Sequence, residues 1–132
     1  MKTVLPLSSF HSMIMIEIGV WNKLKNKFVS MLITLDTGAS VTTISADLLH
    51  QLGYDTTLGV IKRITTASNV EYVKSISFDR MKIGEFEIND IEVYSLTFPP
   101  ESFSSGVLGL NVLKMFDINL LFSKGSIEFA KY

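Results

Sequence analysis

Short apolar runs separated by polar turns recur along the chain and give its first structural signal. One run extends from Met13 to Val20, a Lys-rich polar turn occupies Asn22 to Lys27, and a second run extends from Phe28 to Leu35. Runs of β-branched and apolar residues of this length favour buried strands, and a short polar turn between two of them is typical of a hairpin. The sequence therefore predicts a hairpin whose second strand ends at Leu35.

The same pattern predicts three further hairpins, over residues 59–78, 80–94 and 118–130. Their arms are Gly59 to Thr65 with Val70 to Phe78, Arg80 to Ile83 with Phe86 to Tyr94, and Ile118 to Phe122 with Ser126 to Ala130. The segment Phe98, Pro99, Pro100, Glu101 is predicted to be a loop, because adjacent prolines exclude a central strand. The first ten residues are expected either to be loosely held or to form an edge strand at a dimer contact.

Two short helices interrupt this strand pattern. Ala46 to Leu52 is predicted to be helical, with Ser45 as its cap and Gly53 as its stop. Leu110 to Leu113 is a short apolar stretch of helical character. Because nearly every other segment favours a strand, we expect an all-β fold with one or two short helices. The length suits one domain, so residues 1–132 are expected to form a single domain.

Composition narrows the class of protein. Hydrophobic residues make up 47% of the chain, which is enough to build a core and to leave apolar area for an interface. The formal net charge is -1 and the sequence has no basic patch, which argues against nucleic acid and acidic membrane surfaces as partners. The chain has no Cys, so it has no disulfide framework, and this suits a reducing compartment.

The sequence shows no targeting or membrane-spanning segment. Met1 to Leu7 carries one charge, and its apolar stretch is too short for a signal peptide. No uninterrupted apolar run approaches the roughly 20 residues that span a bilayer. We therefore expect a cytoplasmic protein without a membrane partner.

Asp36 is a carboxylate placed directly behind a predicted buried strand. It opens the triplet Asp36, Thr37, Gly38, which occurs once in the chain and is followed by Ala39 and Ser40. Asp and Gly are also favoured in ordinary turns, so the triplet alone has a purely structural explanation. The small residues beside the carboxylate leave room for a substrate. The hydroxyls of Thr37 and Ser40 are expected to bond local backbone groups.

A second motif lies further along the chain, where Gly106, Val107, Leu108 and Gly109 precede the second predicted helix. Together the two motifs resemble the retropepsin-like aspartic proteases. In that family an apolar strand leads into Asp-Thr-Gly-Ala-Ser, a flap hairpin follows, and two apolar residues and a Gly precede a short helix. The resemblance covers roughly Val29 to Phe129 and implies a retropepsin-like acid protease barrel that uses neither a cofactor nor a metal.

The resemblance also implies roles for individual residues. Asp36 would be the catalytic carboxylate, and Thr37 the hydroxyl that ties two active-site loops together across a dimer axis. Gly38 would let the substrate backbone approach, because it lacks a side chain. The rest of the active-site loop would be Ala39 and Ser40. The supporting loop beneath it would comprise Val107, Leu108 and Gly109.

The flap implied by the resemblance has its tip at Thr65, Thr66, Ala67, Ser68 and Asn69. This tip has no Gly, so Asn69 is the candidate for left-handed backbone geometry. From the sequence alone, residues 59–78 are equally an ordinary hairpin.

The chain also departs from the family pattern at Leu110. Viral members often carry an Arg at this position. Its acidic partner corresponds to Ser40, so both halves of that ion pair are absent together. This favours a bacterial or cellular form of the fold over a viral one.

Peptide hydrolysis by this route needs two carboxylates. One takes a proton from water while the other gives a proton to the carbonyl oxygen, and two carboxylates about 3 Å apart share one proton. The chain has a single triplet, and Asp55, Thr56, Thr57 lacks both the Gly and a preceding apolar strand. The second carboxylate must then be Asp36 of another copy. An enzyme of this kind would be a symmetric homodimer that hydrolyses a peptide or protein substrate.

Other chemistries fit the sequence less well. His11 and His50 are too few for a zinc site, and His50 is expected on the surface of its helix. A triad of Ser45, His50 and an Asp lacks the Gly-x-Ser-x-Gly turn, and Gly106 and Gly109 are not followed by the Lys of a phosphate loop. The main alternative is a peptide-binding or assembly module that keeps the fold without hydrolysis and binds an extended peptide by strand addition.

Overall fold

The structure is a computed structural model in which residues 1–8, 12–65, 67–98 and 104–132 are described. Five residues named in the sequence predictions lie outside the described residues: His11, Thr66, Pro99, Pro100 and Glu101. None of the helices in the described part is long and apolar enough to cross a membrane.

Strands dominate the described residues, as predicted, and the two short helices have close to their predicted bounds. The strands are β1 (Lys2–Pro6), β2 (Met15–Asn22), β3 (Lys27–Leu35), β4 (Thr42–Ser45), β5 (Val60–Thr65), β6 (Val70–Ile83), β7 (Phe86–Leu96), β8 (Gly106–Leu108), β9 (Phe116–Leu121) and β10 (Ser126–Lys131). The helices are α1 (Ala46–Gln51) and α2 (Leu110–Leu113), with single 3₁₀ turns η1 (Thr56–Leu58) and η2 (Phe122–Lys124).

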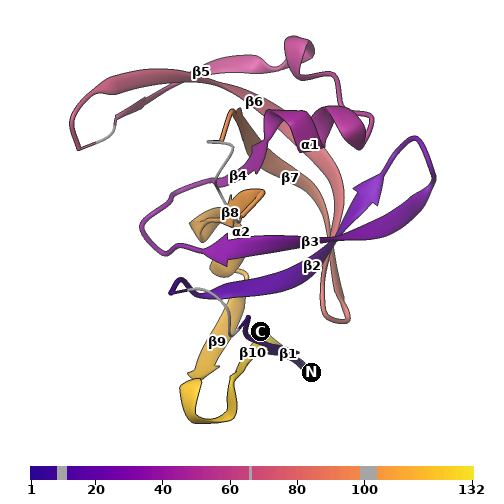
Figure 1. Ribbon diagram of the computed structural model, residues 1–132, viewed down its shortest axis with the longest axis vertical. Coiled ribbons are helices and arrows are strands. Elements are labelled where there is room, and N and C mark those ends of the chain that lie inside the picture. Colours follow the sequence, from indigo (N-terminus) through magenta and orange to yellow (C-terminus); the bar gives the residue numbers. More distant parts are fainter. Residues whose placement is uncertain (9–11, 66, 99–103) are drawn as a thin grey trace.

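Six strands close into a barrel in the order β2-β3-β8-β4-β7-β6. The ring closes where β6 pairs back onto β2, with Gly19 opposite Lys82 and Val20 opposite Met81. β5 pairs with β6 outside the ring, so that the β5–β6 hairpin extends away from the barrel as an arm (Figure 1). The interior is filled by fully buried apolar side chains, including Ile16, Ile33, Ile44, Phe78 and Leu108.

A second, three-stranded sheet in the order β1-β10-β9 lies beside the barrel (Figure 1). Ile127 and Phe129 of β10 are fully buried and pack into the same core cluster as the barrel residues. The first residues therefore form an edge strand, as one of the two expectations for them had it, and the dimer contact in that expectation stays a prediction. That strand pairs with β10 of its own chain.

The largest departure from the predicted elements is β6, which runs unbroken through the expected boundary at Asp79. Asp79 interrupts the apolar pattern, but its backbone N–H donates to the Tyr54 hydroxyl at 3.1 Å. On the paired strand β7, Asp90 lies opposite Asp79 and has a positive φ of 54°. The pairing of β6 with β7 is therefore irregular at this one position and regular on both sides of it. Burial raises the pKa of that Tyr54 hydroxyl to about 12. β6 therefore continues past the polar residue Asp79, because the Tyr54 hydroxyl accepts the hydrogen bond of its backbone N–H.

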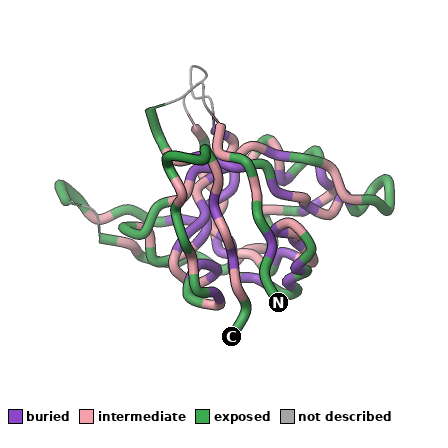
Figure 2. The backbone as a smooth tube through the Cα atoms, turned by 90° about the horizontal axis from the view of Figure 1, so that it is seen from below, coloured by how far each residue is buried: buried purple, intermediate pink, exposed green. Residues whose placement is uncertain are grey.

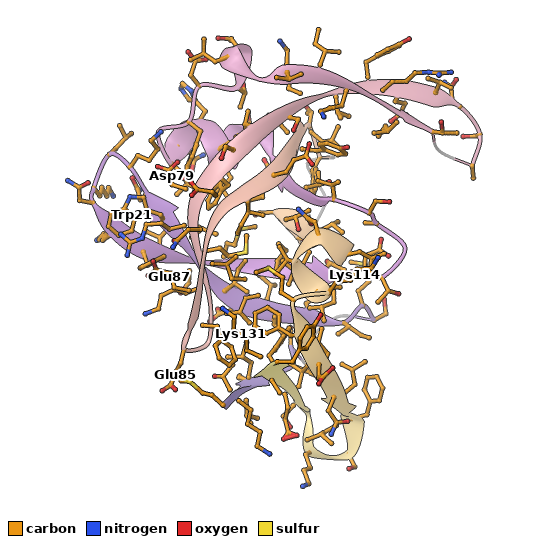
Figure 3. The ribbon with its side chains drawn as sticks, turned by 180° about the vertical axis from the view of Figure 1, so that it is seen from behind. Trp21, Asp79, Glu85, Glu87, Lys114 and Lys131 are labelled. Carbon is orange, nitrogen blue, oxygen red and sulfur yellow. The ribbon has the colours of Figure 1, made fainter. Side chains whose placement is uncertain are left out.

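Charged and aromatic side chains cover the closure of the barrel from outside. The guanidinium of Arg80 lies 4.1 Å from the centre of the Trp21 ring and donates two hydrogen bonds to the Glu87 carboxylate, at 3.0 and 3.1 Å. Those bonds lower the pKa of Glu87. Trp21 and Glu87 face the same side of the molecule (Figure 3). The contacts link β2 to the β6–β7 hairpin on the side where the ring closes.

The turn of the β6–β7 hairpin joins the barrel to the second sheet. Gly84 has a φ of 57°, and a Cβ built there would overlap the side chain of Thr3 in β1. We expect Gly84→Ala to lower the free energy of unfolding by more than about 2 kcal/mol, because backbone strain and overlap with a buried side chain add. Urea unfolding followed by circular dichroism measures this change.

Gly125→Ala is the matched control. Gly125 has a similar φ of 61°, but a Cβ there would meet nothing within 4 Å. Only the left-handed strain remains, which costs about 1 kcal/mol. Equal losses in the two variants would contradict the proposed role of the Gly84–Thr3 contact.

Candidate active site

Asp36 is the first residue after β3 and is held by backbone contacts on both of its sides. Its N–H donates to the carbonyl of Leu108 at 3.1 Å, and its Oδ1 accepts the Gly38 N–H at 2.8 Å. The side chains of Asp36 and Thr37 are exposed. A Cβ at Gly38 would lie 3.0 Å from Asp36 Oδ1, so a larger residue would crowd the carboxylate. The structure therefore presents one oriented carboxylate to solvent.

The predicted supporting loop lies directly against this turn. β8 is inserted between β3 and β4, with Val107 opposite Thr34 in a parallel pairing and opposite Thr43 in an antiparallel one. Gly109 fits tightly, since a Cβ there would lie 2.6 Å from the Val41 carbonyl carbon. Val107, Leu108 and Gly109 thus lie next to the Asp36 turn, as the resemblance implied.

Two residues that the sequence analysis did not single out connect the supporting loop to β4. Asn111 Oδ1 accepts hydrogen bonds from the N–H and the hydroxyl of Thr42, at 2.8 and 2.9 Å. The Thr42 hydroxyl in turn accepts the Gly109 N–H at 3.1 Å, and Asn111 Nδ2 donates to the Glu92 carbonyl at 2.8 Å. Thr42 is fully buried. The sequence feature that could have indicated this contact is Asn111, a polar residue in an otherwise apolar helix.

The expected role of the Thr37 and Ser40 hydroxyls is wrong. In the described part of the chain neither hydroxyl makes a hydrogen bond. Instead the carbonyls of Ala39 and Ser40 accept the N–H groups of Leu110 and Asn111, at 2.8 and 3.1 Å. Ser40 and Leu110 therefore lie close together, where the viral ion pair would be. Backbone hydrogen bonds hold the two segments at that place without an ion pair.

The hairpin predicted as the flap exists, and it extends on the same side of the barrel as the turn between β3 and β4 (Figure 1). Buried residues gather in the middle of the molecule, and the projecting loops are exposed (Figure 2). Within its tip, Thr65, Ala67, Ser68 and Asn69 are exposed. The expectation of left-handed geometry at Asn69 is wrong, because the described residues other than Gly with positive φ are Asn26 and Asp90. Asn69 instead accepts the neighbouring Val70 N–H through its side-chain oxygen at 2.8 Å. The tip therefore turns without a left-handed Asn69.

The base of this hairpin is fixed to the barrel by polar contacts. The Ser75 hydroxyl donates to Glu92 Oε2 at 2.7 Å, and Lys62 Nζ lies 3.8 Å from the same oxygen. Val73, on the same face as Lys62, is buried. These contacts lie toward the barrel, so the hairpin is held at its base while its tip is exposed.

One cavity formed by the described residues lies apart from Asp36. A cavity of about 660 Å³ is lined by the segment Leu5 to Ser8, by parts of β2 and β3, and by Lys82 and Gly84. Asp36 is not among its lining residues. The 660 Å³ cavity lies between the barrel and the second sheet, whereas Asp36 is exposed at the end of β3.

The described residues contain no group of three or more His, Cys, Asp or Glu side chains that could hold a metal ion. His50 is exposed on α1, at the surface position predicted for it. An exposed carboxylate on a rigid turn can accept or donate one proton. Hydrolysis of a peptide bond by carboxylates requires both transfers, which a single carboxylate does not supply.

Comparisons with known proteins agree with this geometry. The model of a protein family described as "gag-polyprotein putative aspartyl protease" matches residues 23–115. A comparison with curated proteins found no match. Among solved structures, the crystal structure of a retropepsin-like aspartic protease from Rickettsia conorii matches with a TM-score of 0.69 and 19% sequence identity. The alignment covers 98% of this chain and 89% of that chain. At that identity the likeness shows the fold.

We expect Asn111→Ala to destabilise the protein, because it removes the acceptor of the buried Thr42 N–H and hydroxyl. Leaving such groups unpaired costs about 1–3 kcal/mol each. Urea unfolding measures the loss. The control is Asn89→Ala on the exposed surface of β7, which should change stability by less than about 0.5 kcal/mol. Similar losses in both variants would contradict a supporting role for Asn111.

Proposed function

The chain belongs to the family of gag-polyprotein putative aspartyl proteases, and from this membership we propose that it is an aspartic endopeptidase that acts as a homodimer. One observation carries the proposal. The only Asp-Thr-Gly triplet of the chain lies at the exposed end of β3, with its carboxylate oriented by the Gly38 N–H and its backbone held by Leu108. A catalytic carboxylate needs both accessibility and a fixed orientation.

In the proposed reaction the two Asp36 side chains of a dimer hold one proton between them. The ionised carboxylate removes a proton from a water molecule, whose oxygen forms a bond to the carbonyl carbon of the peptide. The protonated carboxyl gives its proton to the carbonyl oxygen, which produces a tetrahedral intermediate. When the carbon–nitrogen bond breaks, a proton passes to the amine nitrogen, and the pair again holds one proton.

The neighbouring residues support this chemistry in defined ways. Gly38 leaves the space above the carboxylate open, since a side chain there would approach Asp36 Oδ1. Thr37 is exposed beside it, and in the proposed dimer its hydroxyl bonds the turn of the partner. The β5–β6 hairpin covers the substrate as a flap over an extended peptide. The proposed substrate is thus a peptide or protein segment in extended conformation.

The first test replaces Asp36 by Asn, which has the same shape and keeps an oxygen for the Gly38 N–H. We expect Asp36→Asn to cut a fluorogenic library of apolar peptides at least about 10³-fold more slowly, with unchanged urea stability, because the amide cannot take the proton from water. Asp47→Asn, an exposed Asp on α1, is the control. Full activity in Asp36→Asn would exclude Asp36 as the catalyst. Peptide binding without cleavage by the parent protein would favour the binding module instead.

The second test asks whether the site is shared between two chains. A tenfold excess of Asp36→Asn is mixed with the parent protein and equilibrated. Random pairing then leaves only about one parent chain in ten with a parent partner, so the rate should fall to about a tenth. An unchanged rate under conditions of subunit exchange would show that one chain is sufficient. Mass spectrometry of isotopically labelled parent protein verifies that exchange has occurred.

A further inference from the structure

One face of the β5–β6 arm continues the interior face of the barrel. In a strand, residues two positions apart lie on the same face. On β6, Phe78 and Ile76 pack into the barrel core, and Ile76 lies opposite the buried Val93 of β7. The same alternation places Lys74 and Tyr72 on this face, further along β6 toward the tip. Where β6 passes beyond the rim of the barrel, this face therefore lies over the mouth of the barrel.

We call this surface the inner face of the arm, and residues of both strands contribute to it. They are Ile61, Arg63 and Thr65 of β5, which lie opposite Lys74, Tyr72 and Val70 of β6. In Figure 1 the arm and the turn between β3 and β4 project to the same side of the barrel. A peptide that lies between the Asp36 turn and the arm therefore contacts the inner face.

The inner face carries two cations and no acidic residue. Arg63 and Lys74 make no ion pair with any of the described residues. On the opposite face of the arm, Lys62 lies 3.8 Å from a carboxylate oxygen of Glu92. Glu71 belongs to that opposite face as well, by the same alternation. The acidic side chains near the arm thus leave the charges of the inner face unneutralised.

Large apolar side chains lie beside these cations and are open to solvent. Tyr72 is 69% exposed and Ile61 is 63% exposed. Tyr72 lies opposite Arg63, and Ile61 lies opposite Lys74. Apolar side chains grouped on an exposed face are typical of a surface that a partner covers. Cations beside them favour a partner with negative charge.

We propose that the inner face of the arm binds acidic side chains of the peptide substrate, and that Arg63 and Lys74 select them. The inference rests on the proposed function, because it assigns a substrate class to the site of Asp36. Arg63 can donate two parallel hydrogen bonds to one carboxylate, whereas Lys74 provides a compact point charge. The acidic side chain lies away from the cut bond, because the cut bond lies at Asp36 and the cations lie on the arm.

The spacing of the two cations predicts a pattern in the substrate. Arg63 and Lys74 are diagonal neighbours across the β5–β6 pairing, so their Cα atoms lie about 7–8 Å apart. Alternate residues of an extended peptide lie about 6–7 Å apart and point to the same side. Two acidic residues separated by one other residue can therefore contact both cations at once.

The first experiment uses peptides that share an apolar centre and carry one Glu, or one Gln, at each position in turn. At the position that reaches the inner face, we expect Glu to lower KM at least about threefold relative to Gln, with kcat nearly unchanged, because an ion pair of this kind adds uniform binding. The preference should weaken as NaCl is raised from about 50 to about 500 mM. Equal KM values for the Glu and Gln peptides at every position would overturn the inference.

Substitutions on the arm assign the preference to its inner face. We expect Arg63→Gln and Lys74→Gln each to reduce the preference for Glu, and the double variant to abolish it. Arg63→Glu should instead favour a peptide with Lys at that position. The matched control is Lys62→Gln, which removes the same charge from β5 on the opposite face and should keep the preference. An equal loss in Lys62→Gln would overturn the assignment, and circular dichroism verifies that all variants are folded.

The outcomes separate this inference from the proposed function. Fluorescence anisotropy of labelled Glu and Gln peptides measures the same contact in Asp36→Asn, without cleavage. Tighter binding of the Glu peptide, together with a parent protein that cuts no peptide, would support the acidic preference and contradict the protease. Cleavage of both peptides with equal KM would contradict the preference and leave the protease intact. Neither binding nor cleavage of any of these peptides would contradict both.

Discussion

The position of Asp36 depends on a strand of only three residues. β8 lies between β3 and β4 and bonds to both, although β3 and β4 are joined by the turn that carries Asp36. If β8 were absent, the two strands that flank the turn would lose their common partner, and the Asp36 N–H would lose the Leu108 carbonyl. The orientation of the carboxylate is therefore a property of the sheet, and the local turn sequence supplies only part of it.

The same principle explains which features the sequence predicted. The strand into Asp36, the capped helix α1 and the hairpins are local features, and periodicity, Ser45 and Gly53 were sufficient to predict them. β4 and the continuity of β6 were missed because both depend on distant partners. β4 is held by β7 and β8, and β6 continues past Asp79 because Tyr54 satisfies the backbone there. Long-range hydrogen bonds leave little trace in a local pattern of residue types.

The sequence predicted the motifs of the candidate site but missed the contacts that hold them. The triplet and the Val107 to Gly109 segment were found through their resemblance to a family, and the structure places them side by side. Thr42 and Asn111 were missed, because a buried Thr and an Asn in a short helix have no recognisable spacing in the sequence. The hydroxyls of Thr37 and Ser40 were expected to bond local backbone groups, but backbone hydrogen bonds hold this segment instead. Motifs thus identified the exposed carboxylate, whereas the polar contacts that hold its turn could be found only in the structure.

The pairing of β1 with β10 has a consequence for how the protein forms. Lys2 and Ala130 are partners although they lie near opposite ends of the sequence. All six barrel strands precede β9 and β10 in the sequence, so the second sheet can form only after residues up to Lys131 have been synthesised.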